Sequence, residues 1–272
     1  MDLKTRLKNI PEDASIIEDL DFLIEEMLEQ IGHTDEELRD QLIYRRFGQF
    51  ILNDFIQADK LKHILAICLD DQHLFCQLGE RDTDNVFTRS FSSLVIVLVL
   101  LKDIEERFLL EAEWEHVYRA TINYLQKEQD TRGYIEGKGW AHSIAHGADL
   151  LATLVKHPFF KEEYIQECLE AIACCVGKEK VFIDDEDERL IFAIEAMLEK
   201  GLDEQALVEW MRILVESVSK MELFSLRYFQ YRTNISNFIK SLYFRLAYRG
   251  MSQQRREEIV ELMEKLHSQV YQ

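Results

Sequence analysis

The stretch GKGWAHSIAHGADLL, residues 137–151, places two histidines four residues apart and an aspartate three residues beyond the second. On an α-helix, His142, His146 and Asp149 would share one stripe, with the apolar side chains opposite. Two imidazoles at this spacing can bind one metal ion from a single helix, and the aspartate can be a third ligand or can orient a histidine. The stretch therefore predicts a polar site, with Zn, Mn or Fe as the possible metal.

A ligand groove without metal is the leading alternative for the same stretch. The glutamate of the H-E-x-x-H signature is absent, because Ser143, Ile144 and Ala145 lie between the two histidines. The histidines could also lie on an ordinary solvated helix face or bond to neighbouring helices. Solvated faces in this chain are rich in Glu and Lys, as in KEEYIQECLE, whereas the histidine stripe has many small residues around it. This difference favours a lined groove.

Two further clusters supply polar residues for such a groove. TDNVFTRSF, residues 83–91, contains Asn85 and Arg89 at the start of a strongly apolar segment, and FIDDEDERL, residues 182–190, contains Glu186 and Arg189. A buried guanidinium needs a carboxylate or carbonyl partner, so we expect Arg89 to pair with Glu186, with Asp149 or with an anionic ligand.

Structural roles compete with these functional ones. Asp84 or Asn85 can cap the first helix, and Asp184 or Asp185 can cap the second. Glu186 and Arg189 are three residues apart and can pair with each other. The acidic run lacks the alternating ligands and central glycine of an EF-hand loop, which argues against calcium.

The elements that position these residues are helices. Apolar residues recur at spacings of three and four, and the breaks coincide with glycines or capping residues. Only 10 Gly and 2 Pro punctuate 272 residues, which favours an all-α protein. We expect eleven helices, at roughly 12–31, 35–57, 60–69, 86–102, 112–128, 140–156, 160–176, 186–200, 203–218, 221–248 and 252–270.

The arrangement of these helices is predicted to be an α-α superhelix of HEAT-like helical repeats. Polar clusters near Tyr44, Arg89, His142 and Glu186 recur at steps of about 45, 53 and 44 residues, close to the period of such repeats. Short connections make successive helices antiparallel neighbours. No low-complexity linker interrupts the chain, so we expect one domain over residues 1–272; an irregular helical bundle is the alternative.

Charge and composition limit the possible partners and the compartment. The formal net charge of −19 opposes binding to nucleic acid and to anionic membranes. The N-terminal stretch lacks the apolar region of a signal peptide, and the longest apolar run, residues 94–101, is too short to span a bilayer. The five cysteines include no C-x-x-C pair and are expected to be reduced and mostly buried. These features predict a cytoplasmic protein.

Several of these stretches together resemble a known family. DEELRDQLIYRRF, DDQHLFCQLGE, TDNVFTRSFSSLVIVLVL, RGYIEGKGWAHSIAHGADLL and FIDDEDERL occur in this order. They resemble the bacterial family of proteins with the domain of unknown function 2785 (DUF2785). The resemblance implies an all-helical cytoplasmic protein without an assigned activity, and it makes the Arg89, His142 and Glu186 clusters the recognisable positions of the family.

The leading functional hypothesis is a binding module whose groove holds a small polar ligand or a partner peptide. Its groove residues would be Asn85, Arg89, His142, His146, Asp149, Glu186 and Arg189, with Trp140 as a floor or, more in keeping with its helical position, as core. The alternative is a metal-dependent hydrolase in which His142, His146 and Asp149 hold the ion and Glu186 acts as base or fourth ligand.

A structural scaffold is the third hypothesis, and it predicts that replacement of the histidines has no effect. No P-loop, dinucleotide fingerprint or nucleophile elbow is present. The aromatic-rich segment from Met221 onward is expected to form core or, alternatively, a dimer surface, so an oligomer is possible.

Overall fold

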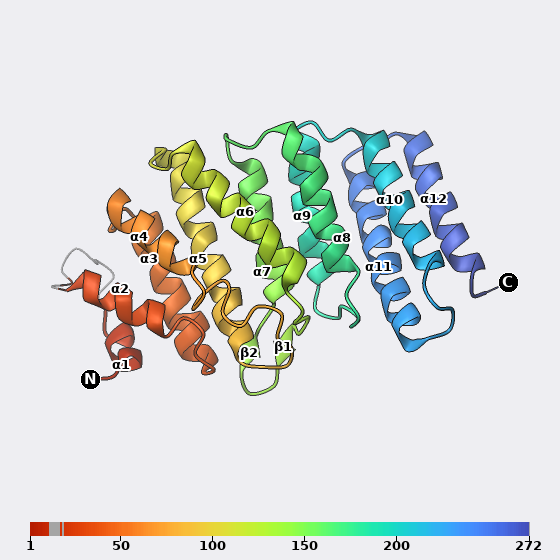
Figure 1. Ribbon diagram of the computed structural model, residues 1–272. Helices are drawn as coiled ribbons and strands as arrows, with labels where there is room; N and C mark the ends of the chain where they lie inside the picture. The colour runs from red at the N-terminus through yellow and green to blue at the C-terminus, as the bar shows by residue number, and fades with distance from the viewer. Residues whose placement is uncertain (11–16, 18, 272) are drawn as a thin grey trace.

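The computed structural model describes residues 1–10, 17 and 19–271, and these residues form an all-α fold. The fold class predicted from the sequence is therefore confirmed. Twelve α-helices occur in the described residues (Figure 1). They are α1 (Leu3–Lys8), α2 (Leu20–Glu29), α3 (Arg45–Leu52), α4 (Ala58–Cys68), α5 (Asn85–Glu106), α6 (Glu111–Lys127), α7 (Ser143–Lys156), α8 (Ile165–Val176), α9 (Glu186–Glu199), α10 (Glu204–Ser219), α11 (Leu226–Tyr248) and α12 (Gln253–Ser268).

Four short elements complete the described structure. A π-helix, η2 (Glu37–Tyr44), leads directly into α3, and a 3₁₀ turn, η3 (Glu162–Tyr164), leads into α8. The strands β1 (Tyr134–Ile135) and β2 (Gly139–Trp140) form an antiparallel hairpin just before α7. Neither α1 nor the hairpin was predicted from the sequence, and part of the first predicted helix, 12–31, lies outside the described residues.

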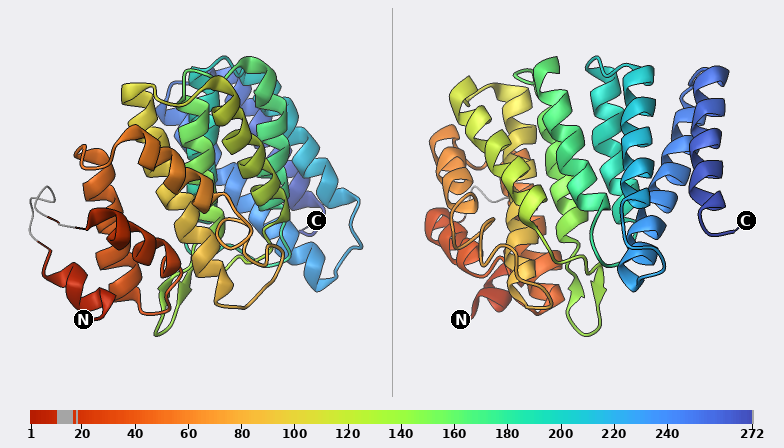
Figure 2. Two further views of the ribbon diagram at one scale, coloured as in Figure 1. Left: turned by 60° about the vertical axis from the view of Figure 1, so that its left-hand side comes forward. Right: turned by 45° about the vertical axis from the view of Figure 1, so that its right-hand side comes forward.

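The helices stack in two layers (Figures 1 and 2). One layer consists of α3, α5, α7, α9 and α11, each in contact with the next. In the second layer α6 contacts α8, and α10 contacts α12. The layers join through α4 on α5, α6 on α7, and α12 on α11. Odd and even helices therefore alternate between layers along the chain from α3 to α12.

Contacts between successive helix pairs join residues about 50 positions apart. Tyr118 donates to Glu167 across a separation of 49, and Arg245 bonds to Glu195 across a separation of 50. Other hydrogen bonds join residues at separations of 50 to 56 positions. This regular spacing is what stacked helix pairs require, although the HEAT-like repeat itself remains a prediction.

One hydrophobic cluster extends from Leu3 in α1 to Leu266 in α12. Its centre includes the apolar run 94–101, which is helical and buried except at Val97 and Leu101. Gly147 lets α7 approach α6, since a Cβ there would lie 2.8 Å from a methyl carbon of Leu125. None of the described helices combines the length and apolar content needed to cross a membrane.

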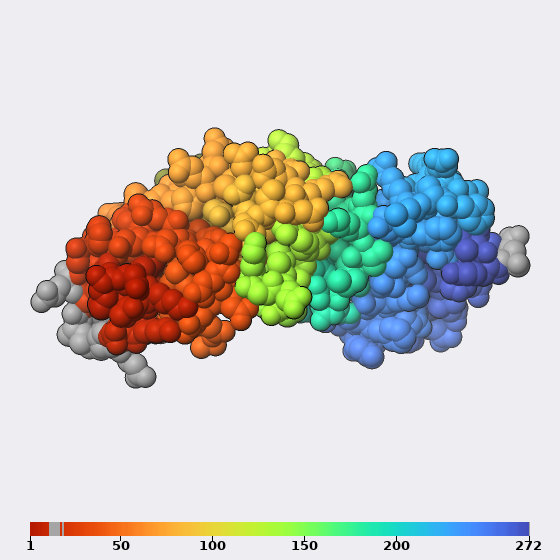
Figure 3. Space-filling model, turned by 90° about the horizontal axis from the view of Figure 1, so that it is seen from below, coloured from red at the N-terminus to blue at the C-terminus, as the bar shows by residue number. Residues whose placement is uncertain are grey.

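Three of the connecting loops gather at one end of the stack, which Figure 3 shows from below. The loops at 69–84, 128–142 and 177–185 contact one another there. The backbone N–H of Asp82 donates to the Asp130 carboxylate, and Lys180 pairs with Asp82. The polar residues singled out in the sequence lie at or near this end.

The described cysteines are all free thiols. Cys68, Cys168 and Cys175 are buried, Cys76 is half-buried and Cys174 is exposed. Burial raises the pKa of the Cys175 thiol to about 12, so this group is an unreactive core side chain.

Candidate functional site

The hairpin, rather than a helix, carries the chain into the histidine segment. Trp140 ends strand β2, and His142 has a left-handed backbone with φ of 49° directly before α7. The predicted helix 140–156 therefore begins three residues late, at Ser143. The prediction that Trp140 and His142 lie within this helix was wrong for this reason. Trp140 is 41% exposed rather than core.

His142 is held by two neighbours. The Trp140 ring stacks on the imidazole with centroids 4.4 Å apart, and Nε2 of His142 lies 3.0 Å from the carbonyl oxygen of Asp184. Because a carbonyl oxygen can only accept, Nε2 carries the proton and Nδ1 presents a lone pair. Burial lowers the pKa of His142, which keeps the ring neutral near pH 7.

His146 lies one turn into α7 and bonds to α5. Its Nδ1 lies 2.7 Å from the hydroxyl of Ser90, and that hydroxyl donates its proton to the carbonyl oxygen of Ala141. Ser90 therefore accepts from Nδ1–H, and Nε2 of His146 carries the lone pair. The edge of Phe91 packs against the ring, and burial lowers the pKa of His146 well below its usual range. This histidine is also neutral.

Glu186, at the start of α9, is the least satisfied group near the histidines. The residue is 1% exposed, and Oε2 accepts from the backbone N–H of Asp184 at 3.0 Å. Oε1 is buried, has no hydrogen-bond partner among the described residues and lies 4.0 Å from Nε2 of His142. Burial raises the pKa of this carboxyl. Asp185, the residue before it, has a left-handed backbone that turns the chain into α9.

Asp149 and Arg189 form an ion pair between α7 and α9. Nε of Arg189 bonds to Oδ1 of Asp149 at 2.8 Å, and Nη2 bonds to Oδ2. Burial nevertheless raises the pKa of Asp149, although the guanidinium opposes this shift. Both charges affect the pKa values of Tyr44 in η2 and of His142, so the ion pair borders the histidine cluster.

The hairpin is fixed to η2 by a buried arginine. Arg39 donates to the carbonyl oxygens of Lys138 and His33, and its guanidinium lies over the rings of Phe87 and Phe91 at 4.2 and 4.8 Å. Gly139 passes so close to η2 that a Cβ would lie 2.6 Å from the Glu36 carboxylate. These contacts position Trp140 over His142.

The arrangement does not assemble the metal site predicted from His142, His146 and Asp149. Nε2 of His142 is directed at a carbonyl, Nδ1 of His146 at a hydroxyl, and both oxygens of Asp149 at Arg189. The two rings are 5.8 Å apart and nearly perpendicular. Across the described part of the chain, no group of three His, Cys, Asp or Glu side chains could hold a metal ion.

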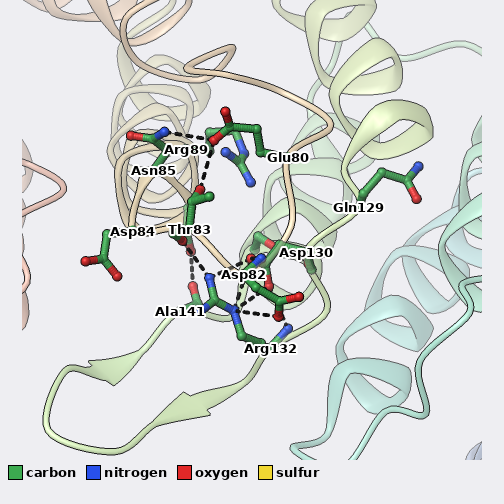
Figure 4. A network of polar contacts seen from close by, with 12 residues as sticks. Glu80, Asp82, Thr83, Asp84, Asn85, Arg89, Gln129, Asp130, Arg132 and Ala141 are labelled. Atoms are coloured by element: carbon green, nitrogen blue, oxygen red, sulfur yellow. Dashed lines mark hydrogen bonds and ion pairs between the residues drawn. The ribbon is translucent and has the colours of Figure 1, made fainter.

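Arg89 and Asn85 lie in a different network, at the loops (Figure 4). The Arg89 side chain is fully buried and bonds to both oxygens of Glu128, at 2.7 and 3.0 Å, and to the carbonyl of Cys76. The expected partners Glu186 and Asp149 were therefore wrong. Asn85 donates to Glu80 and makes no capping bond, and Asp84 makes none either.

The same network ties the loops together through Arg132. Its guanidinium bonds to both oxygens of Asp130 and to the carbonyl oxygen of Thr83 (Figure 4). The Glu128 carboxylate also accepts the backbone N–H groups of Gln129 and Asp130. Arg89 and Glu128 thus stabilise the loops that support the site, because they bond to the backbone of these loops.

Five of the seven predicted groove residues therefore lie together, namely His142, His146, Asp149, Glu186 and Arg189. We call these five, with Trp140, the histidine site. Ser90 and Glu128 were not predicted as part of the site, because their roles depend on residues about 40 to 56 positions away. The exposed ring of Trp140 could have been expected from the glycines at 137 and 139, which favour a turn.

Residues 74–244 match the family model described as "Protein of unknown function (DUF2785)". The match covers more than half of the chain and includes every residue of the histidine site. No curated protein and no solved structure matches the chain.

Proposed function

The chain belongs to the family of proteins of unknown function DUF2785, and from this premise we propose that it is a helical-repeat binding module. The ligand is a small polar molecule or a partner peptide that presents a hydrogen-bond donor, preferably cationic, to the histidine site. Two stacked layers of helices hold that site at the end where the loops gather.

The single observation that carries this proposal is the buried Oε1 of Glu186 beside His142, which has no hydrogen-bond partner in the part of the chain that the structure describes. A buried acceptor without a partner costs about 1–3 kcal/mol. A bound donor would recover this free energy, so the site favours a ligand that carries one.

The neighbouring groups support the same ligand chemistry. Nδ1 of His142 and Nε2 of His146 present lone pairs, and no described residue donates to either atom. Both rings are neutral because burial lowers their pKa values. The exposed Trp140 adds an aromatic surface, which attracts cations. A net charge of −19 also draws cationic ligands and repels nucleic acid.

Tryptophan fluorescence can test this proposal directly. Trp114 and Trp210 are buried, whereas Trp140 is 41% exposed, so binding at the site will change mainly the Trp140 signal. The purified protein would be titrated with Nα-acetyl-lysine amide, Nα-acetyl-arginine amide and Nα-acetyl-glutamate amide, each to about 10 mM. We expect saturation with a cationic probe and no saturation with the anionic one.

Three variants make the titration specific. Trp140→Phe should remove the fluorescence change. Glu186→Gln should weaken binding of the cationic probe by about tenfold or more, since it removes the charge at the buried acceptor. Asp185→Asn is the matched control, because Asp185 is exposed at the same helix start and asparagine tolerates its left-handed backbone. Equal binding of anionic and cationic probes, or equal loss in both carboxylate variants, would contradict the proposal.

A further inference from the structure

The last helix pair leaves an apolar groove open at the C-terminal end of the stack. The groove lies between α11 and α12 and encloses about 400 Å³. Its wall is formed by Tyr243 and Phe244 of α11 and by Ile259, Val260 and Met263 of α12. Phe244 is 54% exposed and Val260 is 43% exposed. These are large apolar side chains in contact with solvent.

The groove lies on the helix pair at the C-terminal end of the described stack. Each earlier pair is covered by the next, since α7 packs on α9, α9 on α11 and α10 on α12. No described helix follows the α11–α12 pair, and its outer side is left uncovered by the described elements (Figure 2). Stacked helical proteins need a polar outer face on their terminal pair to stay monomeric and soluble. An apolar terminal groove is therefore the surface on which a further helix pair would pack.

The charges at the rim identify a suitable occupant. Lys240 lies at one edge of the groove and Glu264 on the other helix, and neither has an ion-pair partner among the described residues. A twofold axis through the groove places α11 of one copy against α12 of the other. Because both side chains line the same groove, Lys240 of each copy would then face Glu264 of the second copy. The rim is therefore complementary to itself.

We propose that a second copy of this chain covers the α11–α12 groove and forms a twofold-symmetric dimer. The apolar wall supplies the affinity, and the two reciprocal Lys240–Glu264 pairs fix the orientation. Because each copy carries a net charge of −19, repulsion between copies opposes association. Added salt therefore strengthens this dimer by screening the repulsion.

Sedimentation velocity on the full chain, from about 1 μM to about 100 μM, tests the proposal. We expect the mass to rise from that of one 32.2 kDa chain toward that of two, at lower concentration when salt is higher. Val260→Glu should raise the dissociation constant at least tenfold. Leu101→Glu, a matched change at a helix position that is 40% exposed outside the groove, should leave it unchanged.

A charge exchange supplies the orientation test. Lys240→Glu should weaken the dimer, and adding Glu264→Lys to it should restore the affinity. Circular dichroism would establish that every variant is folded. A monomer at all concentrations overturns the proposal, as does a dimer that Val260→Glu leaves intact. Binding of a different protein by a chain that stays monomeric overturns it as well.

Discussion

At the scale of single residues, Glu186 is buried and one of its oxygens bonds to none of the described residues, which affects stability as well as binding. Burial raises the pKa of Glu186 in the folded state above its unfolded value. The folded protein then binds this proton more tightly, so the free energy of unfolding falls as pH rises from the unfolded pKa through the folded pKa. Above the folded-state pKa, the ionised carboxyl therefore destabilises the fold.

We expect Glu186→Gln to raise the melting temperature at about pH 7.5, because the variant has no charge to bury. A gain of about 1 kcal/mol would raise Tm by about 2–4 °C in a chain of this size. Below about pH 4, where glutamate is protonated in both states, the gain should vanish. Differential scanning calorimetry at both pH values measures this, with Asp185→Asn as control. A lower Tm for Glu186→Gln near neutral pH would show that the carboxylate stabilises the fold.

Removal of one member of the buried Arg89–Glu128 pair should lower the free energy of unfolding strongly, the opposite of the effect expected for Glu186→Gln. Both side chains are fully buried, so the loss of one leaves an uncompensated charge. We expect Arg89→Ala to lower the free energy of unfolding by about 3–5 kcal/mol in urea denaturation. The double variant Arg89→Met, Glu128→Leu should cost less than the single one. A cost below about 1 kcal/mol for Arg89→Ala would mean that water enters the site.

At the scale of elements, two helical glycines provide a contrast. A Cβ on Gly147 would lie 2.8 Å from Leu125 and 2.9 Å from Tyr124, whereas a Cβ on Gly48 would meet nothing within 4 Å. We expect Gly147→Ala to cost about 1–3 kcal/mol, because α7 must move away from α6. Gly48→Ala should add about 0.5–1 kcal/mol by favouring the helix. Urea denaturation of both variants measures the difference, and equal effects would contradict the close packing of α7.

Helical periodicity predicted most of these elements but not the points where they depart from regular helices. The segments at 60–69, 86–102 and 186–200 correspond closely to α4, α5 and α9, because each has an uninterrupted apolar stripe. The predicted helix 35–57 is a π-helix followed by α3 and ends at Leu52. At its start, the Asp35 carboxylate accepts from the backbone N–H groups of Glu37 and Leu38.

The histidine site could be predicted only as far as its residues lie on one helix or in one cluster. Spacing alone placed His146 and Asp149 on one side of α7, which the structure retains. The partners were not predictable, because Asp184, Ser90 and Arg189 reach the segment from loops and helices distant in sequence. Arg89 is the clearest case, since its partner Glu128 lies at the end of a helix that gave no functional signal.

At the scale of the whole molecule, the acid excess acts on stability. The chain has 51 acidic and 32 basic residues, and folding brings these like charges together. We expect Tm to rise by several degrees when salt increases from about 10 mM to about 150 mM, because the screening length falls from about 30 Å to about 8 Å. Scanning fluorimetry near neutral pH measures the shift. A falling Tm would show that surface ion pairs outweigh the repulsion.

The chain emerges from the ribosome N-terminus first. Because its contacts join residues about 50 positions apart, each helix pair can pack on the previous pair soon after it is synthesised. Once residue 156 has emerged, α7 can pack on α5 and α6 without waiting for the rest of the chain. Contacts of this range are reached quickly compared with those that join distant ends of a chain. The α11–α12 groove forms after the earlier helix pairs of the stack, because α11 and α12 are the last of the described helices to be synthesised.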